Sequence, residues 1–105
     1  MALFNLFTKA YINRAVKEFR QNKNAFLLDV RTVEEYNEGH IEGSINIPLD
    51  TINNVLKTIP DKNAPIYIHC RSGGRSAQAT AIMKRLGYTN LIDIGGILGY
   101  KGELV

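Results

Sequence analysis

Residues 66–79 read IYIHCRSGGRSAQA, and this stretch joins two patterns of secondary structure. The β-branched and aromatic run at 66–68 is typical of a buried strand, and a helical apolar pattern follows from about Ser76. Between them stand Cys70, which is the only cysteine of the chain, and the pair Gly73 and Gly74. A strand, a short glycine-containing loop and a helix in this order predict one βα unit of an α/β domain.

Strands and helices alternate on both sides of this unit. Apolar residues at i, i+3, i+4 and i+7 indicate helices, and short consecutive apolar runs indicate buried strands. In chain order we predict a helix at 12–19, a strand at 25–30, a short helix at 32–38, a strand at 44–48, a helix at 50–59, the strand at 66–69, a helix at 76–86 and a strand at 91–94.

Local residues set several of these boundaries. Asn13 can cap the first helix, and Thr32 with Glu35 three positions later forms a capping box for the short helix. Gly87 stands where a glycine commonly ends a helix. The glycine pair at 95–96 predicts a tight turn after the last strand.

This alternation predicts a single α/β domain at 1–105, with a mainly parallel sheet between layers of helices. Residues 1–10 contain the apolar Leu3, Phe4, Leu6 and Phe7, and we expect them to form a loosely docked N-terminal segment. Ligands of parallel sheets bind at the carboxyl ends of the strands. Cys70 is predicted to lie at one of those ends.

Composition excludes several classes of protein. The net charge is +3 with basic residues spread along the chain, which argues against nucleic-acid binding and favours small anionic ligands. Cys70, His40 and His69 have no zinc-ligand spacing, and one cysteine allows no internal disulfide. No apolar run reaches the length of a membrane span, and the first residues lack the pattern of a signal peptide. We therefore predict a cytoplasmic protein without metal or cofactor.

The loop after Cys70 has the composition of an anion-binding loop. Glycines allow consecutive backbone amides to turn inward, and the start of the following helix adds positive charge. Arg71 and Arg75 flank the loop with two cations. Taken alone, Cys70 could be an inert core thiol, the glycines an ordinary turn and the arginines a solvated surface. Taken together, these residues predict a thiolate nucleophile.

Three segments resemble the single-domain rhodaneses, a family of sulfurtransferases. They are LLDVRTVEEYNEGHIEGSINIP at 27–48, IYIHCRSGGRSAQA at 66–79 and DIGGILGYKGEL at 93–104. The resemblance implies the three-layer α/β/α rhodanese fold, with a mainly parallel sheet of about five strands. This chain departs from the family at Tyr100, where a tryptophan is common, and in lacking a clear strand before its first helix.

The resemblance also implies a reaction and a site. Cys70 would take a sulfane sulfur from an anionic donor such as thiosulfate and pass it from a persulfide to cyanide, a thiol or a protein. The pocket around the persulfide would be formed by Arg71, Ser72, Gly73, Gly74 and Arg75, with the two arginines holding the donor. Asp29 and Arg31 also match family positions, and we expect them to pair and fix neighbouring segments. We also expect mainly structural roles for His40 and His69.

Two other functions remain open from the sequence. Cysteine phosphatases and arsenate reductases of a related fold have five residues between cysteine and arginine, whereas Cys70 and Arg75 enclose four. The shorter loop favours a single sulfur atom over a tetrahedral phosphate. Rhodanese folds also occur as protein-interaction modules, and a sulfur relay to a partner protein would combine that role with catalysis.

Overall fold

The computed structural model describes residues 2–105, with side chains from residue 11 onward. Within that range a parallel four-stranded sheet has the order β2-β1-β3-β4. Its strands are β1 (Phe26–Asp29), β2 (Ser44–Asn46), β3 (Ile66–Cys70) and β4 (Leu91–Gly96). The parallel α/β fold is confirmed, with four strands instead of about five. The segment before β1 forms a helix, so no further strand joins the sheet there.

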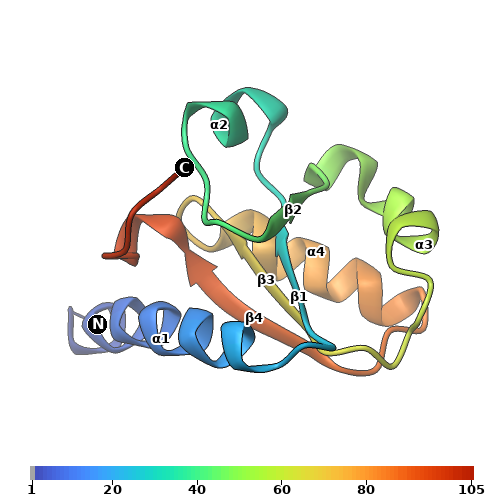
Figure 1. Cartoon of the computed structure of the whole chain (residues 1–105), viewed down its shortest axis with the longest axis horizontal. Coiled ribbons are helices and arrows are strands. Elements are labelled where there is room, and N and C mark those ends of the chain that lie inside the picture. Colours follow the sequence, from blue (N-terminus) through green and yellow to red (C-terminus); the bar gives the residue numbers. More distant parts are fainter. Residues whose placement is uncertain (1) are drawn as a thin grey trace.

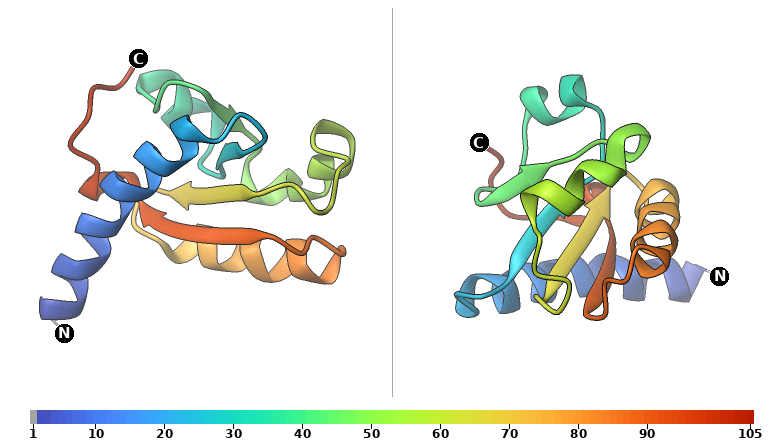
Figure 2. Two further views of the ribbon diagram at one scale, coloured as in Figure 1. Left: turned by 60° about the horizontal axis from the view of Figure 1, so that its bottom comes forward. Right: turned by 90° about the vertical axis from the view of Figure 1, so that its right-hand side faces the viewer.

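Helices cover both faces of this sheet (Figure 2). Helix α1 (Ala2–Gln21) packs on one face, where its Ile12 and Val16 meet Leu27 and Ile94. The opposite face carries the 3-10 helix η1 (Leu49–Asn54), the short helix α3 (Val55–Thr58) and helix α4 (Gly74–Arg85). The predicted three layers are therefore present.

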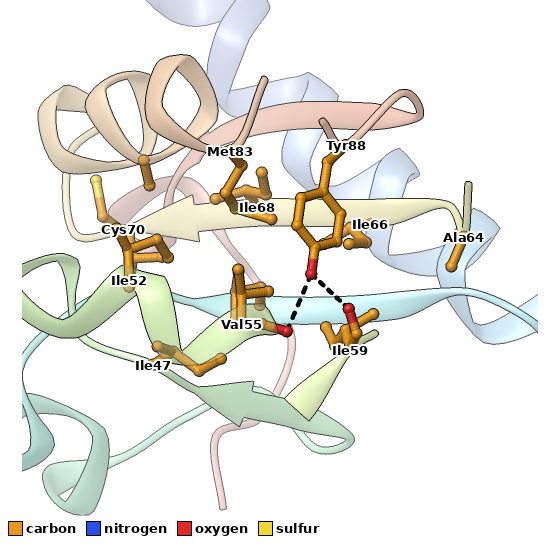
Figure 3. Close-up of a cluster of buried hydrophobic side chains, with 13 residues drawn as sticks. Ile47, Ile52, Val55, Ile59, Ala64, Ile66, Ile68, Cys70, Met83 and Tyr88 are labelled. Atoms are coloured by element: carbon orange, nitrogen blue, oxygen red, sulfur yellow. Dashed lines mark hydrogen bonds between the residues drawn. The ribbon is translucent and has the colours of Figure 1, made fainter. Parts of the chain in front are cut away.

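The larger apolar cluster lies between β3, β1 and the helices of the second face. Figure 3 shows Ile68 of β3 beneath Met83 of α4 and Ile66 beneath Tyr88, with Cys70 at the arrowhead of the strand. The buried Tyr88 hydroxyl donates to the carbonyl oxygens of Val55 at 3.0 Å and Ile59 at 2.5 Å. The helical turn of α3 is thereby fixed to the end of α4.

Helix α1 is longer than predicted. It begins at Ala2, so Asn13 lies inside the helix and does not cap it. The Asn13 amide instead donates to the Gly99 carbonyl at 2.9 Å, and its side-chain oxygen accepts from the Lys101 amide at 2.8 Å. The side chains of residues 1–10, and with them the predicted loose docking, lie outside the described side chains.

The predicted helix at 50–59 is two shorter pieces. Thr51 has non-helical angles (φ −121°, ψ 30°), and a 3-10 helix precedes the four residues of α3. The apolar spacing still placed Ile52, Val55 and Ile59 correctly in the core. Leu56 is 40% exposed, because the short α3 turns that position toward solvent.

Two local predictions are confirmed and one is wrong. The Thr32–Glu35 capping box starts helix α2 (Val33–Glu38), and Gly87 has the positive φ of 101° expected after α4. The pair at 95–96 is no turn, because both glycines continue β4 and pair with β3. A register shift opposite Ile68 and His69 absorbs the extra residue.

After these strands, η2 (Ile97–Gly99) leads into the C-terminal tail. The tail returns to α2, where Val105 and His40 exchange backbone hydrogen bonds at 2.9 and 3.1 Å. The arrowheads of β3 and β4 point toward this end of the molecule (Figure 1). Among the helices of residues 2–105, none is long and apolar enough to cross a membrane.

Candidate active site

Cys70 ends the central strand β3, at the carboxyl edge of the sheet. Its side chain joins the cluster of the α4 face, and the residue is 1% exposed (Figure 3). The sequence placed Cys70 at a strand end, and the structure confirms that position. Neighbouring residues therefore cover Cys70 almost completely.

The loop Arg71–Gly73 turns its last amide back onto the sulfur. The Gly73 N–H donates to Cys70 Sγ at 3.0 Å, and Gly73 has a φ of 111°, a conformation that glycine adopts without strain. Helix α4 begins at the next residue, and the first N–H groups of a helix have no partners within the helix. Negative charge on the sulfur is thus met by an amide and by a helix start.

The end of strand β4 and the following η2 support the back of this loop through close backbone contact. The Leu98 N–H donates to the Arg71 carbonyl at 3.1 Å. A Cβ added at Gly96 would lie 2.6 Å from Ser72 Cα and would also meet the Arg71 carbonyl group. Position 96 therefore requires glycine so that the loop can pack against β4. We predicted a turn there, although close approach of two backbone segments is an equally general reason for a glycine.

Arg75 lies in the first turn of α4, because the helix begins at Gly74 and not at Ser76 as predicted. Its guanidinium forms a bidentate ion pair with Glu35 of α2, at 2.6 and 3.0 Å. The Arg75 hydrogen bond lowers the pKa of Glu35 from 4.5 to about 2, and the same contact raises the pKa of Arg75. Sequence reasoning gave Glu35 only a capping role and missed this pair.

The other loop residues face solvent. Arg71, Ser72 and Gly74 are exposed, and the side chain of Arg71 has no hydrogen bond or ion pair within the described part of the chain. The two arginines predicted to act together are therefore placed differently. Arg71 is an open cation beside the nucleophile, whereas Arg75 is already paired.

Ser76 is a second residue that sequence reasoning missed. It is fully buried, and its Oγ lies 2.8 Å from Asp93 Oδ1 and 3.0 Å from the Gly73 carbonyl oxygen. Asp93 Oδ1 also accepts from the Gly95 N–H at 3.1 Å. These contacts connect the start of α4 to the irregular part of β4.

The predicted pair of Asp29 and Arg31 is present as a buried ion pair at 2.8 Å. His69 is fully buried beside it, with Nδ1 3.3 Å from the Cys70 carbonyl oxygen and Nε2 3.9 Å from Asp29. Burial lowers the pKa of His69 against the opposing effect of Asp29, so the ring is neutral at pH 7. Alternation along β3 directs His69 to the face opposite Cys70.

His40 lies outside the loop. Its ring stacks on Tyr36 with the centroids 3.7 Å apart, and its Nδ1 is 2.9 Å from the Tyr36 carbonyl oxygen. No cluster of three or more His, Cys, Asp or Glu residues suited to a metal occurs among the described residues.

The site consists of a cysteine at the carboxyl end of a parallel strand, a short loop with an inward-turned amide, and the start of a helix. Together these features are typical of α/β domains that bind anions beside a thiol. Residues 13–103 match the family described as the rhodanese-like domain. The chain belongs to this family.

Individual relatives agree with this assignment. The chain is 39% identical over 71 residues to "Thiosulfate sulfurtransferase PspE" of Escherichia coli, covering 67% of this chain and 68% of that protein. It is 40% identical over 68 residues to "Putative sulfur carrier protein YrkF" of Bacillus subtilis, covering 65% of this chain and 36% of that protein. It spans 29% of a longer relative, "tRNA uridine(34) hydroxylase" of Buchnera aphidicola.

Solved structures share the fold. A rhodanese-like domain protein from Staphylococcus aureus superimposes with a TM-score of 0.77 at 30% identity, covering 90% of this chain and 92% of that chain. A structure titled "rhodanese with anions from E. coli" gives a TM-score of 0.72 at 34% identity, covering 77% and 96%.

Proposed function

We propose that this protein is a thiosulfate sulfurtransferase-like enzyme that carries sulfur as a persulfide on Cys70. The observation that supports this proposal most directly is the Gly73 N–H held 3.0 Å from Cys70 Sγ at the start of α4. Such an amide stabilises negative charge on sulfur before and after transfer. The name of the Escherichia coli relative agrees with a thiosulfate donor.

The proposed reaction has two steps with a covalent intermediate. The Cys70 thiolate attacks the sulfane sulfur of thiosulfate, an S–S bond forms, and the old S–S bond breaks with sulfite leaving with the electron pair. An acceptor such as cyanide then attacks the outer sulfur of the persulfide and leaves as thiocyanate. The second step returns the thiolate, so no oxidant or reductant is consumed.

The loop residues divide the work of binding in this proposal. Ser72, Gly73 and Gly74 supply the backbone around the persulfide, and Arg71 attracts the anionic donor from solvent. Arg75 supports the loop from the first turn of α4. The cytoplasmic location expected from the sequence stays a prediction.

Transfer to a protein acceptor is a second form of the same proposal. A relative named as a putative sulfur carrier protein favours it. In that case the Cys70 persulfide would pass its outer sulfur to a cysteine thiolate of a partner, with the same balance of electrons. The phosphatase alternative gains no support from these two relatives, which are named as a sulfurtransferase and a putative sulfur carrier, and residues 13–103 of the chain match the rhodanese-like domain.

Intact-mass spectrometry of the reduced protein tests the proposal. Thiosulfate should add one sulfur atom, about 32 Da, in the covalent step, and cyanide or a dithiol should remove it. The Cys70→Ser variant is the control, because a serine hydroxyl cannot carry the persulfide. Failure of both thiosulfate and polysulfide, which carry sulfane sulfur, to give any adduct would refute the proposal.

A further inference from the structure

The two cations of the loop differ in what surrounds them. Arg71 is exposed and has no side-chain partner among the described residues, whereas both terminal nitrogens of Arg75 contact Glu35. Arg75 lies in the first turn of α4, two residues after Gly73, whose N–H contacts Cys70 Sγ at 3.0 Å. The charge of Arg75 therefore acts at the nucleophile, but beside an opposite charge.

We propose that Glu35 is a specificity-determining positioning residue, which masks Arg75 and so limits how strongly an anionic reagent is attracted to Cys70. The inference rests on the proposed function for its biological meaning, because thiosulfate is a dianion. A paired carboxylate and guanidinium present little net charge to an approaching donor. Arg71 then supplies the cation that the donor meets.

The position of Glu35 is fixed independently of Arg75. Its Oε1 accepts from the Thr32 N–H at 3.0 Å and from the Thr32 hydroxyl at 3.1 Å. The Thr32 hydroxyl in turn accepts from the Glu35 N–H at 3.2 Å. The capping box therefore aims the carboxylate at α4, and it does so from a helix that is far from Arg75 in the sequence.

The charge on Glu35 is present under ordinary conditions. With a pKa of about 2, the carboxyl group is ionised throughout the neutral range. Its side chain is 24% exposed and that of Arg75 is 32% exposed, so the pair lies at the rim of the site. Removing this one negative charge would leave an unmasked cation near the sulfur.

Glu35→Gln removes the charge and little else. Glutamine serves as well as glutamate at the third position of a capping box, so α2 is retained. The amide oxygen can still accept from the Thr32 N–H and from Arg75. Glu34→Gln is the matched control, because Glu34 is an exposed neighbour in the same helical turn and its loss changes the net charge equally.

The decisive measurement is the ratio of Cys70 alkylation rates with iodoacetate, an anion, and iodoacetamide, its neutral analogue. Thiolate content and access to the sulfur affect both rates, so the ratio reports the local electrostatic potential. For one unit charge acting over several ångströms near a protein surface, Glu35→Gln should raise this ratio about three- to tenfold at low salt. High salt should reduce the increase.

A double variant tests whether Glu35 acts by masking Arg75. Arg75→Gln should lower the ratio, and Glu35→Gln combined with Arg75→Gln should return it near the wild-type value, because the pair is then removed as a whole. Circular dichroism establishes that each variant is folded.

Two results would overturn the inference. One is an unchanged ratio in Glu35→Gln, including the case in which both alkylation rates rise equally because the pair limits access instead of charge. The other is an equal change of the ratio in Glu34→Gln. The readout needs no sulfur transfer, so it stands even if thiosulfate gives no persulfide. If the enzyme does use thiosulfate, its KM should fall in Glu35→Gln by at least the same factor.

Discussion

Replacing Gly96 with alanine should damage the active-site loop through one methyl group. The added Cβ would lie 2.6 Å from Ser72 Cα and 2.9 Å from the Arg71 carbonyl carbon, both of which are backbone atoms. Neither can rotate away as a flexible side chain would. The loop or β4 must therefore shift by about 1 Å to restore van der Waals separations near 3.5–4 Å.

This shift has two measurable costs. Overpacking in a tightly packed region lowers the free energy of unfolding by about 1–3 kcal/mol. Moving the loop by about 1 Å also displaces the Gly73 N–H from Cys70 Sγ, and misplacement of that size can lower a positioned reaction about a hundredfold. Gly96 has a φ of −115°, so the effect comes from the lack of space and not from the backbone conformation.

Gly74→Ala is the matched control. A Cβ at Gly74 would meet nothing within 4 Å, and this residue lies in the first turn of α4. Alanine there should leave the free energy of unfolding unchanged or raise it by up to about 1 kcal/mol. Urea unfolding and the rate of persulfide formation, followed by intact mass, should be measured on both variants. Wild-type values of both quantities in Gly96→Ala would show that the loop does not depend on this contact.

Three further changes test separate residues. Cys70→Ser should abolish the adduct of about 32 Da while the circular dichroism spectrum stays unchanged, because serine is nearly isosteric but forms no persulfide; an adduct on the variant would place the nucleophile elsewhere. Arg71→Ala should raise the thiosulfate KM about tenfold with little change in kcat, because the lost contact stabilises the bound substrate and the transition state equally. Steady-state kinetics measures both constants, and a fall in kcat alone would contradict this role of Arg71. Glu35 has a lowered pKa, so its stabilisation is complete above pH 4.5 and is lost as the pH falls toward 2. Since the ion pair is partly exposed, Glu35→Gln should lower the free energy of unfolding by about 1–2 kcal/mol at pH 7, as measured by urea unfolding. This difference from the wild type should shrink toward pH 2. A difference that does not depend on pH would exclude the ion pair as its source.

Features determined by neighbouring residues could be predicted from the sequence. The capping box of Thr32 and Glu35, the glycine after α4 and the strand ending at Cys70 depend on a few consecutive positions. The spacing at 50–59 also gave the buried positions Ile52, Val55 and Ile59, but it showed neither the exposure of Leu56 nor the break at Thr51.

Features that depend on distant segments could not be predicted in this way. The continuation of β4 through Gly95 and Gly96 depends on pairing with β3. In the sequence alone, two adjacent glycines predict a turn. The Glu35–Arg75 pair joins residues 40 positions apart, and Ser76 meets Asp93 across 17 positions. Such pairs follow from the three-dimensional arrangement of helices and strands, which composition and periodicity specify only in outline.

Helix α2 contains no buried residue. Its side-chain hydrogen bonds to other elements are the Glu35 contact to Arg75 and the Tyr36 hydroxyl bond to the Ser44 carbonyl at 2.8 Å. A segment held in this way can open without the free energy needed to separate the sheet from its apolar layers. The amide hydrogens of α2 should therefore exchange with solvent by local fluctuation, whereas those of β3 should exchange only with global unfolding. Each such opening would release Arg75 while the strand that holds Cys70 stays intact.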